Sequence, residues 1–127
     1  FDDYAHHPTE IKATYLAAKK ISNNITVIFQ PHRYSRTKIL MNEFVSVLSK
    51  IKNLYILKTY PAGEKLIKGA TAKNLFLNLL KKNKNTIYVD KENILYKHLY
   101  KHASHKKLII FMGAGSISKM AYNFIKK

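Results

Sequence analysis

The sequence predicts an α/β fold, specifically a Rossmann-like, doubly wound and mostly parallel sheet with helices on both faces. Short continuous apolar runs, such as residues 25–29 and 108–112, alternate with longer stretches whose apolar residues recur at helical spacing. Continuous apolar strands are typical of parallel strands buried on both faces, and their alternation with helices indicates βαβ units. The length of 127 residues suits a single domain with its own core, which we place at residues 1–127.

The first predicted helix covers residues 8–22, because Pro8 suits a first helical turn and Glu10 complements the positive end of the helix dipole. A polar break at residues 22–24 separates it from the strand at residues 25–29. The later elements alternate in the same way: a helix at 35–50, a strand at 54–57, a helix at 71–82, a strand at 86–89, a helix at 92–102, a strand at 108–112 and a helix at 116–125.

The chain opens with a polar segment that leads directly into the first helix. In a doubly wound sheet, that helix returns from a strand, and we expect this strand to be truncated and to end at about Phe1. We also expect its place to be central, beside the strand at residues 25–29. The sequence therefore predicts four recognisable parallel strands, with residues 2–7 as an irregular lead-in.

Composition limits the function classes. The net charge of +16 suggests nucleic-acid binding, but the lysines are dispersed along the chain and no nucleic-acid recognition motif is present, so no specific nucleic-acid partner is expected. Cysteine is absent, which excludes disulfides and thiolate metal sites. No apolar run has the length of a membrane span, so we expect a cytoplasmic protein with no membrane partner. We expect His98, His102 and His105 to be surface residues and predict no metal site.

Arginine occurs only at Arg33 and Arg36, although the chain has 23 basic residues. Its planar guanidinium binds carboxylate or phosphate in a bidentate manner that lysine cannot reproduce. Both arginines follow the strand at 25–29, where ligand sites of open α/β sheets occur. His32 precedes them. An exposed basic helix start is the alternative, but the helix dipole disfavours cations there unless an anion is bound.

The segment at residues 2–10 gathers two carboxylates, a phenol and two imidazoles at a helix start. Such a segment could hold a ribose through Asp3 and an anionic group through His6 or His7. It could also be a capped helix start with solvated polar residues. A zinc site is disfavoured because adjacent histidines rarely chelate one ion together.

Two further segments are candidates for function. The turn Gly113-Ala114-Gly115-Ser116 resembles a phosphate-binding turn, although the glycines could equally serve a tight strand-to-helix connection. The connection at residues 58–70 is long for such a fold and contains Tyr60-Pro61-Ala62-Gly63-Glu64. Long ordered loops in compact domains are often functional.

Taken together, these segments resemble the C-terminal domain of the Mur ligases. The motifs are Asp2-Asp3-Tyr4-Ala5-His6-His7-Pro8-Thr9-Glu10, Gln30-Pro31-His32-Arg33-Tyr34-Ser35-Arg36-Thr37, Tyr60-Pro61-Ala62-Gly63-Glu64 and Gly113-Ala114-Gly115-Ser116-Ile117. The resemblance implies ATP-dependent amide ligation through an acyl phosphate, with Mg²⁺ supporting phosphoryl transfer. It also implies UDP-N-acetylmuramate and L-alanine as substrates. This sequence lacks a phosphate loop, so we assign most ATP and Mg²⁺ binding to a central domain and uridine diphosphate binding to an N-terminal domain.

The resemblance also implies roles for individual residues. Asp3 and His7 would bind the nucleotide. Tyr4 and His6 would lie by the reacting centre, and His32, Arg33, Arg36 and Ser116 would line the pocket for L-alanine and the muramoyl carboxylate. Ala5 stands where the family commonly has glycine. The alternative is a free-standing basic Rossmann-type module that binds a phosphorylated ligand.

Overall fold

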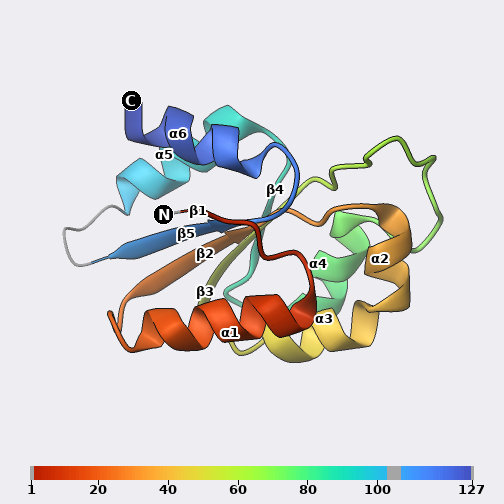
Figure 1. The fold of residues 1–127 in the computed structure, drawn as a ribbon, viewed down its shortest axis with the longest axis horizontal. Coiled ribbons are helices and arrows are strands. Elements are labelled where there is room, and N and C mark those ends of the chain that lie inside the picture. Colours follow the sequence, from red (N-terminus) through yellow and green to blue (C-terminus); the bar gives the residue numbers. More distant parts are fainter. Residues whose placement is uncertain (1, 103–106, 127) are drawn as a thin grey trace.

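The computed structural model describes residues 2–102 and 107–126 and confirms the α/β class (Figure 1). A five-stranded, all-parallel sheet has the order β1-β5-β2-β3-β4. Its strands are β1 (Asp2–Asp3), β2 (Ile25–Phe29), β3 (Asn53–Leu57), β4 (Ile87–Val89) and β5 (Leu108–Met112). The helices are α1 (Pro8–Lys19), α2 (Tyr34–Ile39), α3 (Met41–Leu48), α4 (Ala72–Leu80), α5 (Glu92–Lys101) and α6 (Ile117–Lys126).

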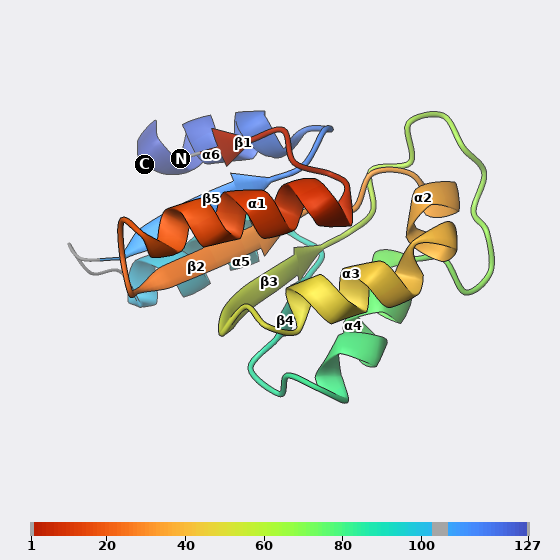
Figure 2. The same cartoon turned by 60° about the horizontal axis from the view of Figure 1, so that its bottom comes forward.

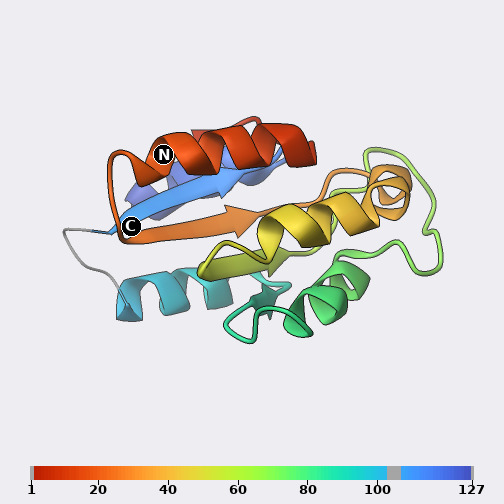
Figure 3. The ribbon, with the colours of Figure 1, turned by 90° about the horizontal axis from the view of Figure 1, so that it is seen from below.

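Helices cover both faces of the sheet, as a doubly wound fold requires. Helices α1, α3 and α4 pack on one face, where Phe29 and Phe44 lie in the same core cluster. Figure 3 shows α1 and α3 along this face, and the two helices contact each other. Helices α5 and α6 pack on the opposite face with Ile28 and Phe111. Consecutive residues of β2 therefore enter opposite cores, which explains why the whole strand is apolar and buried.

The structure shortens most of the predicted helices and divides one of them. The helix expected at residues 35–50 is two helices that meet at Leu40, which ends α2 and precedes α3. Phe44 and Leu48 hold α3 against the core, whereas α2 follows the arginine-containing loop away from the sheet (Figure 2). The first helix was expected to reach residue 22, but α1 ends at Lys19 and the Ile21 side chain beyond it is 76% exposed.

The predicted place of the first strand is wrong. β5 pairs with β2 along its whole length, from Ile25↔Leu108 to Phe29↔Met112, so no slot separates these two strands. β1 lies instead on the outer side of β5, where Asp2 and Asp3 pair with Phe111 and Met112. Residues 2 and 3 thus form a short edge strand, and not an irregular lead-in. Apolar patterning does not encode strand order, and here the connection through α1 crosses over β5. Phe1 lies outside the described residues.

The parallel arrangement brings the strand-to-helix loops to one edge of the sheet. The loops after β1, β2, β3 and β5 meet there, and the connection from β3 to α4 contains the long segment expected at residues 58–70 (Figure 2). Within the described parts of the chain, none of the helices is long and apolar enough to cross a bilayer.

Candidate functional site

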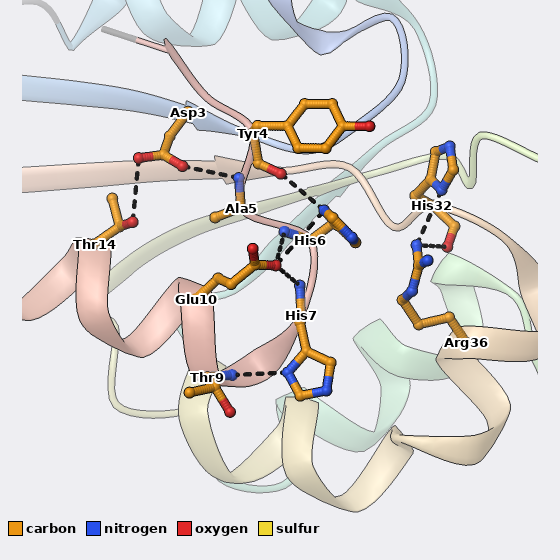
Figure 4. Close-up of polar contacts among 10 residues, drawn as sticks. All are labelled: Asp3, Tyr4, Ala5, His6, His7, Thr9, Glu10, Thr14, His32 and Arg36. Atoms are coloured by element: carbon orange, nitrogen blue, oxygen red, sulfur yellow. Dashed lines mark hydrogen bonds and ion pairs between the residues drawn. The ribbon is translucent and has the colours of Figure 1, made fainter.

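The β1–α1 loop is fixed mainly by its own polar groups (Figure 4). One carboxylate oxygen of Asp3 accepts a hydrogen bond from the Ala5 amide at 2.8 Å, and the other accepts from the Thr14 hydroxyl at 3.2 Å. The backbone carbonyl of Asp3 accepts from the Gly113 amide at 3.1 Å, which joins this loop to the loop after β5. Ala5 is buried. Asp3 therefore stabilises the loop, and its carboxylate keeps lone pairs for further donors.

His7 and Glu10 form a capping box at the start of α1. The His7 Nδ1 accepts from the Thr9 amide at 3.2 Å, and Glu10 Oε1 accepts from the His7 amide at 3.0 Å. Both amides are among those that an α-helix leaves without intrahelical partners. The capped helix start considered from the sequence is therefore present. In the neutral His7 ring the proton is on Nε2, which remains a potential donor to an anion.

His6 connects the first loop to the arginine-containing loop. Its Nδ1 donates to the Tyr4 carbonyl at 2.9 Å and lies 3.6 Å from Glu10 Oε1. The Tyr4 ring, which is 67% exposed, meets the His6 ring edge-on. On its other side, His6 faces His32 with 6.2 Å between the ring centroids. The structure thus places the Tyr4, His6 and His32 rings next to one another.

Arg36 is held by His32, one turn before it. Arg36 Nη1 donates to His32 Nδ1 at 3.0 Å and to the His32 carbonyl at 3.1 Å (Figure 4). Burial, and then the positive charges of Arg36 and Arg33, lower the pKa of His32. His32 is therefore a neutral acceptor at pH 7, and it fixes the direction of the Arg36 guanidinium.

Arg33 occupies an unusual backbone position directly before α2. Its φ of 74° lies in the left-handed region, which a non-glycine residue adopts at a cost of about 1–3 kcal/mol. Its side chain is exposed, and its amide donates to the Tyr60 carbonyl at 2.8 Å. Arg33 thus presents an exposed side chain directly before α2, and its positive charge contributes to lowering the pKa of His32.

The two glycines after β5 make room for neighbouring groups. A Cβ on Gly113 would lie 3.1 Å from the Gln30 carbonyl oxygen, and a Cβ on Gly115 would lie 2.5 Å from Tyr60 Cγ. Close packing therefore accounts for both residues, which favours the tight-connection interpretation over a phosphate-binding turn.

Ser116 lies beside a cavity of about 240 Å³ that Gln30, Tyr60 and Asp90 also line. The Ser116 hydroxyl accepts from Gln30 Nε2 at 3.2 Å. His32, Arg33 and Arg36 do not line this cavity. Tyr60 contacts both regions, because its ring stacks on His32 and would meet a Cβ on Gly115. Ser116 therefore belongs to the same edge of the sheet but faces a different hollow.

The structure gathers five of the predicted residues and separates the other three, Asp3, His7 and Ser116. Tyr4, His6, His32 and Arg36 are linked by ring contacts or hydrogen bonds, and Arg33 is next in the chain to His32. Asp3 and His7 are directed toward α1 (Figure 4).

Some neighbouring residues were not predicted. Gln30, Tyr60 and Glu64 hold the loops around this group, although no role was assigned to them. All three lie within the motifs of the resemblance, and the length of segment 58–70 was a further signal for Tyr60 and Glu64.

The described histidines and acids form no cluster of three that could hold a metal ion. His98 is partly buried and meets Tyr55 edge-on, so it is not the fully exposed residue expected from the sequence. His102 is exposed, and His105 lies outside the described residues.

The fold and this group of residues define a parallel α/β domain with a basic site at the carboxyl edge of its sheet. The sequence profile described as "Mur ligase, glutamate ligase domain" matches residues 1–115. The chain belongs to this family, and the structure describes the C-terminal domain of a Mur ligase.

Curated relatives and solved structures agree with this assignment. The chain is 45% identical to the UDP-N-acetylmuramate–L-alanine ligase of Rickettsia typhi, over 94% of this chain and 25% of that protein. It is 41% identical to the enzyme of the same name from Aquifex aeolicus, over 100% of this chain and 27% of that protein. The crystal structure of UDP-N-acetylmuramate-alanine ligase from Thermotoga maritima matches with a TM-score of 0.74 and 28% identity, over 98% of this chain and 25% of that one. The chain thus spans about a quarter of these relatives.

Proposed function

We propose that this chain is the C-terminal domain of an ATP-dependent ligase that joins L-alanine to UDP-N-acetylmuramate in peptidoglycan synthesis. The family assignment and the relatives of that name support the proposal. The structural observation that carries it is the His32–Arg33–Arg36 group at the carboxyl edge of the sheet, where two hydrogen bonds to His32 direct the Arg36 guanidinium and Arg33 is exposed. No observation favours a free-standing module that binds a phosphorylated ligand.

The proposed chemistry has two steps. A carboxylate oxygen of UDP-N-acetylmuramate attacks the γ-phosphorus of ATP, the bond to the β-phosphate oxygen breaks, and ADP leaves. The amine of L-alanine then attacks the acyl carbon of the resulting acyl phosphate, the C–O bond to phosphate breaks, and the amine loses a proton. Both steps involve carboxylate or phosphate oxygens, which guanidinium groups stabilise through paired charged hydrogen bonds.

Arg33 and Arg36 would hold the carboxylate of L-alanine and the muramoyl carboxylate. Arg36 is already directed by its two hydrogen bonds to His32, so little conformational freedom would be lost on binding. His6 and Tyr4 would border the reacting centre, because His6 lies between Tyr4 and His32. Ser116 would approach the amino-acid substrate from the neighbouring cavity.

The nucleotide would contact the first loop. The Asp3 carboxylate, with one hydrogen bond at each oxygen, could accept further bonds from ribose hydroxyls. His7 Nε2 could donate to a nucleotide oxygen. Mg²⁺ would neutralise phosphate charge during transfer. Because the sequence contains no phosphate-loop motif, we assign Mg²⁺ and most of ATP to a central domain of the same enzyme, with uridine diphosphate in an N-terminal domain. The proposed setting is the cytoplasm.

The proposal is tested in the longer enzyme that carries this domain, by measuring phosphate release with ATP, Mg²⁺, UDP-N-acetylmuramate and L-alanine. Arg36→Lys and Arg33→Lys should each lower kcat/KM about tenfold or more, because lysine keeps the charge but loses the paired geometry, and a hydrogen bond to a charged group contributes about 1.5–3 kcal/mol. Lys81→Ala and Lys84→Ala are matched controls at exposed positions and should leave the rate unchanged.

Two results would contradict the proposal. If both arginine variants keep wild-type kcat/KM, Arg33 and Arg36 do not bind the substrate carboxylates as proposed. Turnover by residues 1–127 alone, well above a blank, would contradict the assignment of ATP and uridine binding to other domains.

A further inference from the structure

The function proposed above leaves one loop without a role. Residues 60–64, which we call the brace loop, connect β3 toward α4 and carry none of the groups assigned to substrate. They nevertheless contact the arginine-containing loop at its backbone, at the start of α2 and at the His32 ring. These three contacts are described in turn.

The first contact is between backbones. The Tyr60 amide donates to the Pro31 carbonyl at 2.8 Å, and the Arg33 amide donates to the Tyr60 carbonyl at 2.8 Å. His32 and Tyr60 thereby form an isolated parallel bridge beyond the ends of β2 and β3. These two bonds fix the backbone directly before the strained φ of Arg33, and such strain persists only where surrounding contacts determine the backbone.

The second contact is the carboxylate of Glu64. Glu64 Oε1 accepts from the Ser35 amide at 3.1 Å, and Oε2 accepts from the Ser35 hydroxyl. Helix α2 has no acidic residue in its first turn, and Arg33, the residue before it, makes no side-chain cap. Glu64 therefore supplies from 29 residues away the acceptor and the negative charge that a helix start requires. The hydrogen bonds from Ser35 lower the pKa of Glu64.

A tight turn directs Glu64 back toward α2. The Glu64 amide donates to the Pro61 carbonyl at 3.1 Å, which closes a four-residue turn. Its central residues Ala62 and Gly63 have φ values of 52° and 85°. Two positive φ values in succession are typical of a type I′ turn, in which alanine is strained and glycine is not.

The third contact is aromatic. The Tyr60 ring stacks on His32 with a centroid separation of 5.4 Å and an interplanar angle of 10°. Tyr60 also fills the space that the missing side chain of Gly115 leaves. His32, which directs Arg36, thus stacks on the Tyr60 ring, and this ring packs in turn against Gly115 in the loop after β5.

We infer that the brace loop positions the two arginines and that Glu64 is a positioning residue for substrate carboxylate binding. The inference has a structural half, that Glu64 holds the start of α2 and thereby the arginines, and a kinetic half, that this contact improves the binding of L-alanine. Only the kinetic half rests on the proposed function. Glu64 would act through Ser35 and α2, without touching substrate.

The structural half is tested on residues 1–127 by NMR. The two arginines give two guanidinium Nε signals, which Arg33→Lys and Arg36→Lys assign. In Glu64→Ala, exchange of the Ser35 amide with solvent should accelerate about tenfold and the Arg36 Nε signal should broaden or move. Glu64→Gln keeps one oxygen acceptor and should give a smaller change. Glu43→Ala, at an exposed acid in the first turn of α3, is the matched control and should change neither signal.

The kinetic half is tested in the longer enzyme. Glu64→Ala should raise the KM for L-alanine about tenfold while kcat falls less than about threefold, and Glu64→Gln should recover part of the loss. An unchanged Ser35 amide in Glu64→Ala would overturn the brace. A changed amide with an unchanged KM would overturn the positioning role. A wild-type enzyme that ligates no alanine would overturn the proposed function, and the amide and guanidinium signals would still decide the brace.

Discussion

The β1–α1 loop and the β2–α2 loop lie side by side at the edge of the sheet, but they are held in different ways. In the first loop, Asp3 and Glu10 accept hydrogen bonds from residues at most 11 positions away. In the second, the backbone of Arg33 and the start of α2 depend on Tyr60 and Glu64, which come from another loop. The side-chain hydrogen bonds of the first loop are local, so its shape should depend less on its neighbours than that of the second loop, whose supports come from another part of the chain.

The largest expected effect concerns the support of the brace. Gly115→Ala would place a methyl group 2.5 Å from Tyr60 Cγ, close to the backbone of that residue, so the brace loop must move. We expect a loss of about 1–3 kcal/mol in the free energy of unfolding, measured by urea denaturation. In a protein that already carries Tyr60→Ala, Gly115→Ala should cost much less free energy of unfolding, because the ring that the methyl group would meet is absent. Additive penalties in this cycle would show that Gly115 and Tyr60 are not coupled.

A smaller effect is expected in the self-contained loop. Glu10→Ala removes the acceptor of the His7 amide and should lower the free energy of unfolding by about 1 kcal/mol. Exchange should accelerate at the amides of α1 but not at Ser35, because the hydrogen bonds that Glu10 accepts come only from the first loop. Faster exchange at Ser35 in this variant would show that the comparison drawn above is wrong.

Ala62→Gly should stabilise the brace loop slightly. The φ of 52° strains alanine but not glycine, although glycine also increases the entropy of the unfolded chain. The expected gain is about 0.5 kcal/mol or less in the free energy of unfolding. The matched change Ala17→Gly, inside α1, should destabilise the domain by about 1 kcal/mol. A loss at Ala62 as large as that at Ala17 would contradict the turn geometry.

The smallest expected effect is a dependence of the braced loop on pH. The folded protein lowers the pKa of His32 below its ordinary value of 6.5, so the unfolded chain binds a proton more readily. The contribution of His32 to stability is therefore fully present above about pH 6.5 and declines as the pH falls toward the lowered pKa. Urea denaturation at several pH values should show this decline, and His32→Gln should reduce it. If the free energy of unfolding of His32→Gln falls by the same amount over this pH range, the decline belongs to other titratable groups and not to His32.

Local sequence patterns predicted the parts of this domain that local interactions build. The strands at Ile25–Phe29 and Leu108–Met112 have the predicted bounds, and Pro8 and Glu10 occupy the first turn of α1 as expected. The arginine-containing loop also lies where it was expected, directly after β2 and before a helix, with Arg33 preceding α2.

Long-range interactions set what the sequence did not predict. Strand order depends on which connection crosses β5, and the break at Leu40 depends on where α2 is attached. The capping of α2 by Glu64 joins residues 29 positions apart. No periodicity or spacing encodes such a contact, so the sequence marked residues 58–70 only by the length of the connection and by the motif at residues 60–64, without indicating what they contact.

The central claim is that Arg33 and Arg36 together form a carboxylate-binding site. The most direct measurement is a titration of residues 1–127 with L-alanine, observed through the two arginine Nε signals. Ethylamine, which lacks the carboxylate, is the matched control ligand. The account predicts that L-alanine shifts both signals with one common saturation curve and that ethylamine shifts neither. Unchanged arginine signals at saturating L-alanine, or equal shifts with ethylamine, would contradict it.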